Sequence, residues 1–378
     1  MKQKNSFSGQ IGFVFAAAGS AVGVGNLWRF PYLAAKDGGG LFLLIYLVLV
    51  LTVGFVLLTT DIAIGRKTGK SAIYAYESMK KKWKFLGVIT FLVPVLIMTY
   101  YAVIGGWILR YIVIYLTSSG KQAVADDCFT AFISSPSSVW YGLIFMLLTA
   151  LIVYNGVEEG IERVSKFIMP VLLIMVIGIA IFSLTLKTTL DDGTVRTGLQ
   201  GLKVYMKPDL TGITVGRFLQ ITLDAMSQLF FSLSVSMGIM ITYGSYVKKD
   251  VDLNKAVSQI EIMDTGVAFL AGVMIIPAVF VFSGLDGMSA GPGLMFVSLP
   301  KVFYSMGTVG RVIGILFFVL AGFAALTSCI SVLESITANC MELFHTERKK
   351  TTRVLSVIYL IATAVIALGY SIFYVEVA

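Results

Sequence analysis

The sequence of 378 residues predicts an all-α polytopic membrane protein, and three observations lead to that fold class. Hydrophobic residues make up 57% of the chain and the mean hydropathy is +0.88, whereas soluble domains are about 45–50% apolar. Apolar runs near the ~20 residues that a helix needs to cross a bilayer recur along the whole length. Lys and Arg concentrate in short stretches between those runs, as in the loops of membrane proteins.

Hydropathy and helix breakers together predict nine spanning helices. Their expected ranges are 11–35, 41–65, 85–116, 138–155, 163–184, 216–247, 256–283, 309–344 and 353–375. The first ten residues lack the apolar core of a signal peptide, so the first run is expected to remain as a helix. After "GPG" at 291–293, the stretch "LMFVSLPKVF" predicts a short re-entrant or surface helix between two spans.

The distribution of charge predicts the topology. Seven Lys and Arg crowd into residues 66–84, and further basic residues lie at 155–166, 248–255 and 345–353. With the N-terminus in the cytoplasm all four stretches lie inside, as the positive-inside rule requires. We therefore expect a multi-pass protein of the plasma membrane whose net charge of +8 reflects topology, with no nucleic-acid partner.

The residue types that support most enzyme sites are scarce. The three cysteines have no metal-binding or redox spacing, and His345 is the only histidine. No HExxH, no paired catalytic acids and no serine with a nearby base are present, so an intramembrane enzyme is not expected.

Two predicted helices carry their own breakers. "GSAVGVGNLWRFPY" at 19–32 places three glycines, an asparagine and an arginine inside the first, and "FFSLSVSMG" at 230–238 places small and hydroxyl residues inside the sixth. Helix 1 opens one group of five helices and helix 6 opens the next, which predicts an inverted repeat with paired discontinuous helices. The expected units are repeat 1 at about 11–184 and an incomplete repeat 2 at about 216–375, within one transmembrane domain spanning 1–375.

A break at mid-membrane needs a physical reason. Each unpaired backbone group costs several kcal/mol in hydrocarbon unless another group satisfies it. Freed carbonyls can bind a hard cation, and the N-terminus of a half-helix can bind a carboxylate. The alternative is a small-residue packing face or a simple kink. Asp61 and Asp264 lie in apolar surroundings, where a carboxylate costs at least about 2.5 kcal/mol, so both are functional candidates.

Four motifs carry a family resemblance: "AGSAVGVGNLWRFPYLAAKDGGG", "YYAVIGGW", "FFSLSVSMGIMITYGSYV" and "LTSCISVLES". They resemble helices 1, 3, 6 and 8 of the neurotransmitter:sodium symporter family, in its bacterial amino-acid transporter branch, and the resemblance runs from about residue 7 to 375. It implies an inverted five-helix repeat that works by alternating access. Members usually have eleven or twelve helices, so the chain is expected to be truncated after helix 9.

The resemblance implies two sodium sites built from oxygen donors, which suit a hard cation. Site 1 would use Ala21, Asn26, Ser232 and Asp264. Site 2 would use the carbonyls of Gly19, Val22 and Ala324 and the hydroxyls of Thr327 and Ser328. The residues alone leave a purely structural role open for Thr327 and Ser328, because hydroxyls in membrane helices commonly donate to the carbonyl four residues earlier in the same helix.

The resemblance also implies a pocket for one amino acid. The expected lining residues are Ala21, Gly23, Gly25, Ile97, Tyr101, Phe231, Ser232, Ser234, Met237, Ser328 and Val332. The Tyr101 phenol would donate to the substrate carboxylate, although a lone membrane tyrosine is more often a packing residue. Because the pocket offers no basic side chain, the expected cargo is a neutral amino acid with a hydrophobic or aromatic side chain.

Gating and chloride roles follow from the same resemblance. Arg29 and Gln228 would guard the outer vestibule, although an arginine near a helix end can also snorkel to the interface. Lys4, Glu342 and Tyr246 would form the inner gate. Asp61 would accept hydrogen bonds from the unwound part of helix 6. The fixed acid Asp264 implies that transport does not require chloride. Tyr46 and Gln228 would remain of the residues that surround the chloride ion in chloride-dependent members.

The sequence therefore predicts a sodium-coupled symporter of neutral amino acids, with two Na⁺ as its cofactors and the lipid bilayer as its surroundings. It leaves a homodimer open. A second hypothesis is a truncated, non-transporting membrane protein of the same fold that binds an amino acid. A proton-coupled relative would need a basic residue near Ser328, and Thr327 and Ser328 supply none.

Overall fold

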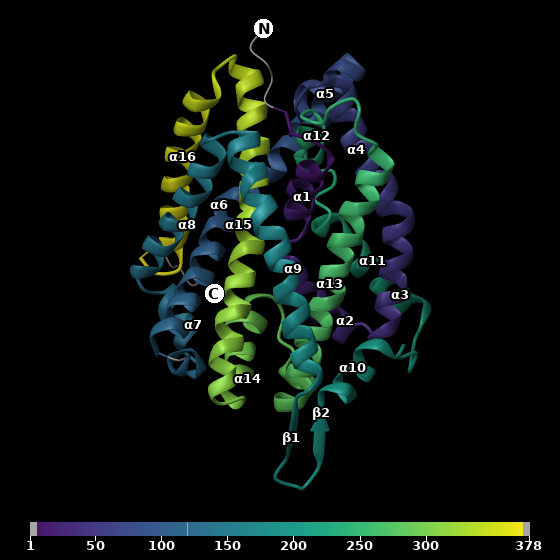
Figure 1. The fold of residues 1–378 in the computed structure, drawn as a ribbon, viewed down its shortest axis with the longest axis vertical. Coiled ribbons are helices and arrows are strands. Elements are labelled where there is room, and N and C mark those ends of the chain that lie inside the picture. Colours follow the sequence, from purple (N-terminus) through teal and green to yellow (C-terminus); the bar gives the residue numbers. More distant parts are fainter. Residues whose placement is uncertain (1–5, 119, 373–378) are drawn as a thin grey trace.

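The computed structural model describes residues 6–118 and 120–372, and helices dominate it. Long helices run side by side between two ends of the molecule, with the N-terminus at one end and a short hairpin, β1–β2, at the other (Figure 1). Seven helical segments of the described residues are long and apolar enough to cross a membrane, and the bent pair α1–α2 makes an eighth. The remaining predicted span corresponds to α11 and α12, which a break separates.

The first five predicted spans correspond to the elements of the first half of the chain. These are α1 (Gln10–Ala21), α2 (Val24–Lys36), α3 (Gly40–Leu49), the π-helix η1 (Val50–Gly54), α4 (Phe55–Thr68), α5 (Ala72–Met79), the 3₁₀ turn η2 (Lys81–Trp83), α6 (Lys84–Ser118), the 3₁₀ turn η3 (Lys121–Val124), α7 (Cys128–Ile133), α8 (Ser137–Tyr154), the π-helix η4 (Val157–Glu162) and α9 (Arg163–Leu184).

The second half begins with a hairpin and continues with the other four predicted spans. Its elements are β1 (Lys187–Thr189), β2 (Val195–Thr197), α10 (Gly198–Met206), α11 (Val215–Ser232), α12 (Ile239–Gly244), α13 (Leu253–Ser283), the 3₁₀ turn η5 (Leu285–Gly287), the π-helix η6 (Leu294–Ser298), α14 (Leu299–Ser305), α15 (Thr308–Phe344) and α16 (Arg348–Gly369). The strands pair antiparallel, with Thr188 opposite Arg196. The expected short helix after "GPG" is η6 with α14.

Both predicted breaks are present. Between α1 and α2 the chain is extended at Val22 and Gly23, and the two helices meet at a bend of 53°. Between α11 and α12, residues 233–238 leave the helical path, with positive φ at Ser234 (52°), Ser236 (60°) and Gly238 (74°). Positive φ is costly for residues other than glycine, so the surrounding contacts must hold the two serines in place.

The boundary of the last helix differs from its prediction. We expected a charged loop at 345–353 before a helix at 353–375, but α16 starts at Arg348 and ends at Gly369. The reason is that Lys and Arg are good helix formers, and their long side chains reach polar partners from a helix as readily as from a loop. The connection is only three residues long, with His345 in a left-handed conformation (φ 51°).

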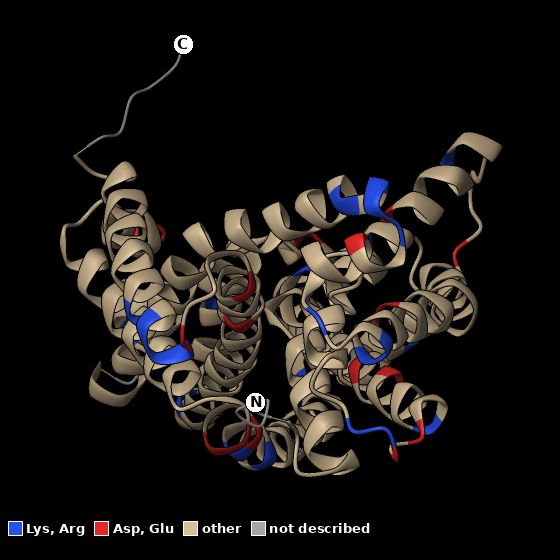
Figure 2. Ribbon diagram, turned by 90° about the horizontal axis from the view of Figure 1, so that it is seen from above, with Lys and Arg blue, Asp and Glu red and all other residues tan. Residues whose placement is uncertain are grey.

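Seen from the end that bears the N-terminus, charged residues form separate small groups among helices that are otherwise uncharged (Figure 2). The basic stretch 80–84 is exposed there. The interior is apolar by contrast: α15 and α13, the most deeply covered of the long spans, pack against α1 and α2 around the two breaks. The breaks therefore lie inside the bundle, where lipid cannot reach them.

Candidate functional site

A small cavity lies where the two broken helices face each other. Its volume is about 30 Å³, and it is lined by Ser20, Ala21, Gly23, Asn26, Ile97, Tyr101, Phe231, Ser232, Ser234, Met237, Ile239, Ser328, Ser331 and Val332. All the expected pocket residues except Gly25 are among them. Such a volume holds little more than a water molecule. An amino acid therefore needs the surrounding side chains or half-helices to move apart.

Gly25 does not line the cavity, but it leaves room for the ring of Phe231, which does. A Cβ at this position would stand 2.7 Å from a ring carbon of Phe231. The absence of a side chain therefore lets that ring pack directly over the start of α2.

The start of α2 is the positively polarised element of the cavity. Gly23 precedes the helix in an extended conformation, and its N–H donates to the side-chain oxygen of Asn26 at 3.0 Å. The first N–H groups of a helix have no intrahelical acceptor. The hydroxyl of Tyr101 approaches to 3.3 Å from the position of a Gly23 Cβ. Backbone N–H groups and a phenol thus converge where a carboxylate would be held.

Asn26, Ser232 and Asp264 form a buried polar cluster beside this cavity. The Asn26 amide donates to Asp264 Oδ1 at 2.8 Å and to Ser232 Oγ at 3.1 Å, and Ser232 Oγ lies 2.9 Å from both carboxylate oxygens. Asp264 is fully buried. Among the described residues no Lys, Arg or His pairs with it.

A buried carboxylate without a cationic side chain fits a bound cation. Removing a charge from water costs several kcal/mol unless an opposite charge compensates it. Carboxylate, hydroxyl and carbonyl oxygens are the donors that a hard monovalent ion accepts. The described residues contain no cluster of three or more His, Cys, Asp or Glu that would hold a transition metal. The donor chemistry of the Asp264 cluster therefore favours an ion such as sodium.

Residues of the second predicted ion site make contacts between α15 and α1. Ser328 Oγ donates to the carbonyls of Ser20 at 3.2 Å and Val22 at 3.5 Å. Thr327 Oγ1 donates to the carbonyls of Phe323 at 3.0 Å and Ala324 at 3.2 Å.

Gly19 completes that group, because its Cβ position lies 3.2 Å from the Thr327 Cβ. The bond from Thr327 to Phe323 is the i−4 bond of the alternative interpretation. Ser328 therefore reaches carbonyls of α1, whereas the hydrogen bonds of Thr327 in the described structure stay within α15.

Three serines, Ser20, Ser234 and Ser331, join the two breaks. The sequence analysis named Ser234 as a pocket residue and did not name the other two. Ser20 Oγ accepts from Ser331 at 2.7 Å, and its carbonyl accepts from Ser234 at 3.3 Å. Ser20 lies inside the breaker motif and was passed over because serine is small and common in packed membrane helices. Only the approach of α15 shows that Ser20 lines the cavity and accepts hydrogen bonds from Ser331 and Ser328.

Asp61 supports the break in helix 6 from outside the cavity. Its carboxylate accepts from the Ser236 N–H at 2.8 Å, the contact that the sequence analysis expected. The Tyr46 hydroxyl and the Gln228 amide are buried without a hydrogen-bond partner among the described residues. Glu261, one turn before Asp264, was missed although the motif "EIMDTGV" contains both acids. Its Oε1 likewise has no partner in the described part of the chain.

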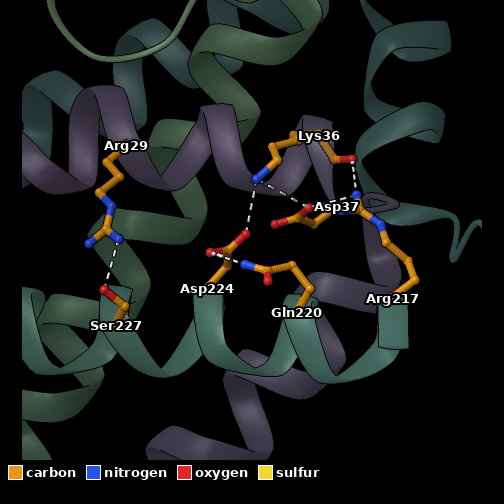
Figure 3. A network of polar contacts seen from close by, with 7 residues as sticks. All are labelled: Arg29, Lys36, Asp37, Arg217, Gln220, Asp224 and Ser227. Carbon is orange, nitrogen blue, oxygen red and sulfur yellow. Dashed lines mark hydrogen bonds and ion pairs between the residues drawn. The ribbon is translucent and has the colours of Figure 1, made fainter. Parts of the chain in front are cut away.

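Polar contacts join α2 to α11 at the end opposite the N-terminus (Figure 3). Arg29 donates to Ser227 Oγ at 2.9 Å, and the Lys36 ammonium lies 3.0 Å from Asp224 Oδ2. Gln228, the expected neighbour of Arg29 in an outer gate, is fully buried.

A second ion pair closes the same contact. Arg217 Nη2 lies 2.8 Å from Asp37 Oδ1 and donates to the carbonyl of Lys36 at 3.0 Å. Burial raises the pKa of the Asp37 carboxyl, and the neighbouring Lys36 opposes that effect. The partners on α11 were missed, although positions 217, 220, 224 and 227 recur at helical spacing on one face. The contacts tie the far halves of both broken helices together.

Two residues of the expected inner gate, Tyr246 and Glu342, lie in the described part of the chain. Tyr246 donates to Glu334 Oε1 at 2.6 Å, and Arg348 pairs with Glu334 at 2.6 Å. Glu342 accepts from the Ser71 N–H at 3.0 Å. Lys4 lies outside the described residues, so its expected pairing with Glu342 stays a prediction. The buried partner was missed because Glu334 falls within the apolar pattern of helix 8.

These features define a class of protein: a helical membrane transporter in which two broken helices enclose a small polar cavity with buried oxygen ligands. The comparisons identify the family. The model of the sodium:neurotransmitter symporter family matches residues 4–138 and 129–375, so the chain belongs to this family.

Relatives and a solved structure agree with this assignment. An uncharacterized sodium-dependent transporter of Bacillus subtilis is 38% identical over 352 residues, which are 91% of this chain and 74% of the relative. A similarly described protein of Methanocaldococcus jannaschii is 32% identical over 399 residues, 99% of this chain and 77% of that one. The crystal structure of MhsT in complex with L-phenylalanine superposes with a TM-score of 0.84 at 37% identity, covering 99% of this chain and 83% of MhsT. These relatives are transporters and not enzymes, so the protein is a sodium-coupled membrane transporter.

Proposed function

We propose that the protein is a symporter that moves one neutral, hydrophobic or aromatic amino acid together with two sodium ions. The cavity between the two breaks supports this proposal most directly, because the start of α2, the Tyr101 phenol, Asn26 and Ser232 line it, and the last two hold the buried Asp264 carboxylate beside it. The N-terminus of α2 and Tyr101 would hold the substrate carboxylate. The substrate's side chain would lie among Ile97, Phe231, Met237 and Val332.

The two ions would occupy the places argued above. Ala21, Asn26, Ser232 and Asp264 would hold the first next to the substrate carboxylate. Gly19, Val22, Ala324, Thr327 and Ser328 would hold the second between α1 and α15. Sodium supplies the positive charge that compensates Asp264 and the freed carbonyls.

We propose further that the transport does not require chloride. Asp264 supplies a permanent negative charge where chloride-dependent members of the family carry a neutral residue. The relatives include the human sodium- and chloride-dependent taurine transporter, 25% identical over 421 residues, so chloride dependence occurs among proteins similar to this one and has to be tested here. Tyr46 and Gln228 would face Asp264 in place of a halide.

The expected topology completes the proposal. The N-terminus would be cytoplasmic, the membrane would be the plasma membrane, and residues 11–184 and 216–375 would form inverted repeats. The two far half-helices, which polar contacts join, would then move together as the outer wall of the cavity.

Binding and uptake test the proposal together. Purified protein would bind labelled leucine, tryptophan or tyrosine in sodium buffer but not in potassium buffer, in chloride or gluconate alike. Proteoliposomes with an inward sodium gradient would accumulate the same amino acid, because each ion that enters gains about 2.3 kcal/mol per 100 mV. Sodium-dependent binding without uptake would support the non-transporting alternative, and binding indifferent to sodium would reject the ion assignments.

Asn26→Leu tests the first ion site. The substitution removes both the side-chain oxygen and the amide that contacts Asp264, so sodium-dependent binding should be lost while the protein still inserts. Gel filtration in detergent checks the fold. An unchanged affinity in sodium would reject Asn26 as a ligand.

A further inference from the structure

A second cleft lies at the end opposite the N-terminus, away from the proposed transport site. Its volume is about 610 Å³, and it is bounded by the end of α6, η3, α14 and the start of α15. The lining residues are Tyr115, Ser118, Gly120, Lys121, Phe303, Tyr304, Gly307, Thr308, Gly310 and Arg311. The larger side chains among them are aromatic or basic, which is the character of a site for an anion attached to an apolar body.

The positive charge of the cleft has three sources. Lys121 is exposed and has no hydrogen bond or ion pair among the described contacts. Arg311 uses two nitrogens to hold the carbonyls of Tyr115 at 3.2 Å and Leu116 at 2.8 Å, which fixes its guanidinium at the rim. The N-terminus of α15 opens into the same cleft after Gly307 and carries no side-chain cap. Its first N–H groups add positive potential.

Two further observations favour an anionic occupant. The Tyr115 side chain is 2% exposed and its hydroxyl has no hydrogen-bond partner in the described part of the chain. No acidic residue of the described chain lines the cleft, and of the two exposed acids that follow η3, Asp126 and Asp127, the first pairs with Lys301 of α14. The basic groups therefore keep their charge for a ligand.

The surroundings of the cleft indicate a lipid rather than a soluble anion. Thr308 lines the cleft, and Val312 and Leu316 follow it at intervals of four residues on the same face of α15. Both are exposed, as is Leu116 at the end of α6. An apolar strip thus leads from the cleft along the spanning helices, where acyl chains lie. Tyr304 is exposed at the rim, as aromatic residues are at membrane interfaces.

We infer that this cleft binds the headgroup of an anionic phospholipid, with its acyl chains along Val312 and Leu316. Lys121 and Arg311 contact the phosphate, and the start of α15 faces it. In the proposed orientation the lipid belongs to the outer leaflet, and it joins α6 and α14 to α15 at a distance from the substrate cavity.

Native mass spectrometry of the full chain in detergent tests the inference. We expect phosphatidylglycerol to bind more tightly than phosphatidylcholine with the same acyl chains. Lys121→Gln should weaken phosphatidylglycerol binding about fivefold, the value of one lysine near an anionic lipid. The matched control is Lys187→Gln, in the β1 strand at the same end, which should leave the affinity unchanged.

Other results would overturn the inference. These are equal binding of the two lipids, or equal effects of Lys121→Gln and Lys187→Gln. Displacement of phosphatidylglycerol by stoichiometric glycerophosphoglycerol or inorganic phosphate would show that the cleft takes a soluble anion. Arg311→Lys keeps the charge but loses the two-point bond to α6, and it should weaken lipid binding without changing sodium-dependent amino-acid binding.

Discussion

Gly25 shows how a single missing side chain shapes the substrate cavity. It lies in the first turn of α2, and the ring of Phe231 occupies the space that a side chain would take. Phe231 is itself one wall of the cavity. Any larger residue at position 25 must displace that wall, even though Gly25 does not line the cavity.

Gly25→Ala should therefore weaken amino-acid binding. Forcing an aromatic ring about 30° from its rotamer costs about 0.5–1.5 kcal/mol, so we expect a loss of affinity of up to about tenfold in sodium buffer. Equilibrium binding of the labelled substrate measures it. Gly178→Ala on α9 is the control, because no atom lies within 4 Å of its Cβ position. Equal affinities of the two variants would contradict this role of Gly25.

Among the elements, α15 is held to its neighbours by a buried ion pair. Glu334 is fully buried and contacts both Tyr246 and Arg348, the first residue of α16. A buried pair is not by itself a large source of stability, but removing one partner leaves an uncompensated charge. Glu334 therefore holds the first residue of α16 against α15.

Glu334→Gln should lower the free energy of unfolding by about 3 kcal/mol, because Arg348 then keeps a buried charge without a carboxylate. Chemical denaturation in detergent, followed by tryptophan fluorescence, measures the change. The control is Glu158→Gln at an exposed position, whose free energy of unfolding should lie within about 0.5 kcal/mol of that of the original protein. The double variant Glu334→Gln, Arg348→Met should recover part of the lost free energy of unfolding. A further loss would contradict the interpretation that the unpaired charge of Arg348 causes the destabilisation.

At the scale of the whole molecule, the proposed ion sites join the two breaks to other parts of the bundle. The carbonyls of α1, the hydroxyls of α15 and the carboxylate of Asp264 come from segments far apart in the sequence. An ion that binds them joins these segments only in the folded protein. Ligands that bind the folded state alone raise its stability by mass action.

Sodium should accordingly stabilise the protein against heat, and potassium at the same ionic strength should not. When sodium is present at 100 times the Kd of one site, the free energy of unfolding rises by about 2.7 kcal/mol. The contributions of two independent sites would add. Thermal denaturation over a sodium series measures the effect. Asp264→Ala should reduce the sodium-dependent part of the gain, and an identical response to both salts would count against ion binding at these breaks.

The sequence by itself determined the class of protein, the order of the helices and the positions of both breaks. Composition and hydropathy carry that information locally, because a helix in lipid must satisfy its own backbone and a breaker such as "GSAVGVG" is visible wherever that rule fails. The family motifs added most of the cavity residues. Hydropathy was less informative at the ends of helices, where charged residues belong equally well to a helix or a loop.

Only the tertiary structure decided which polar side chains meet. Ser20 with Ser331, Glu334 with Arg348, and Arg29 with Ser227 are pairs from different helices, and nothing in the local pattern of either partner specifies the other. The same holds for Lys121 and Arg311, which line one cleft although 190 positions of the chain separate them. Packing sets these distances, and a one-dimensional pattern contains no record of how the helices pack against one another.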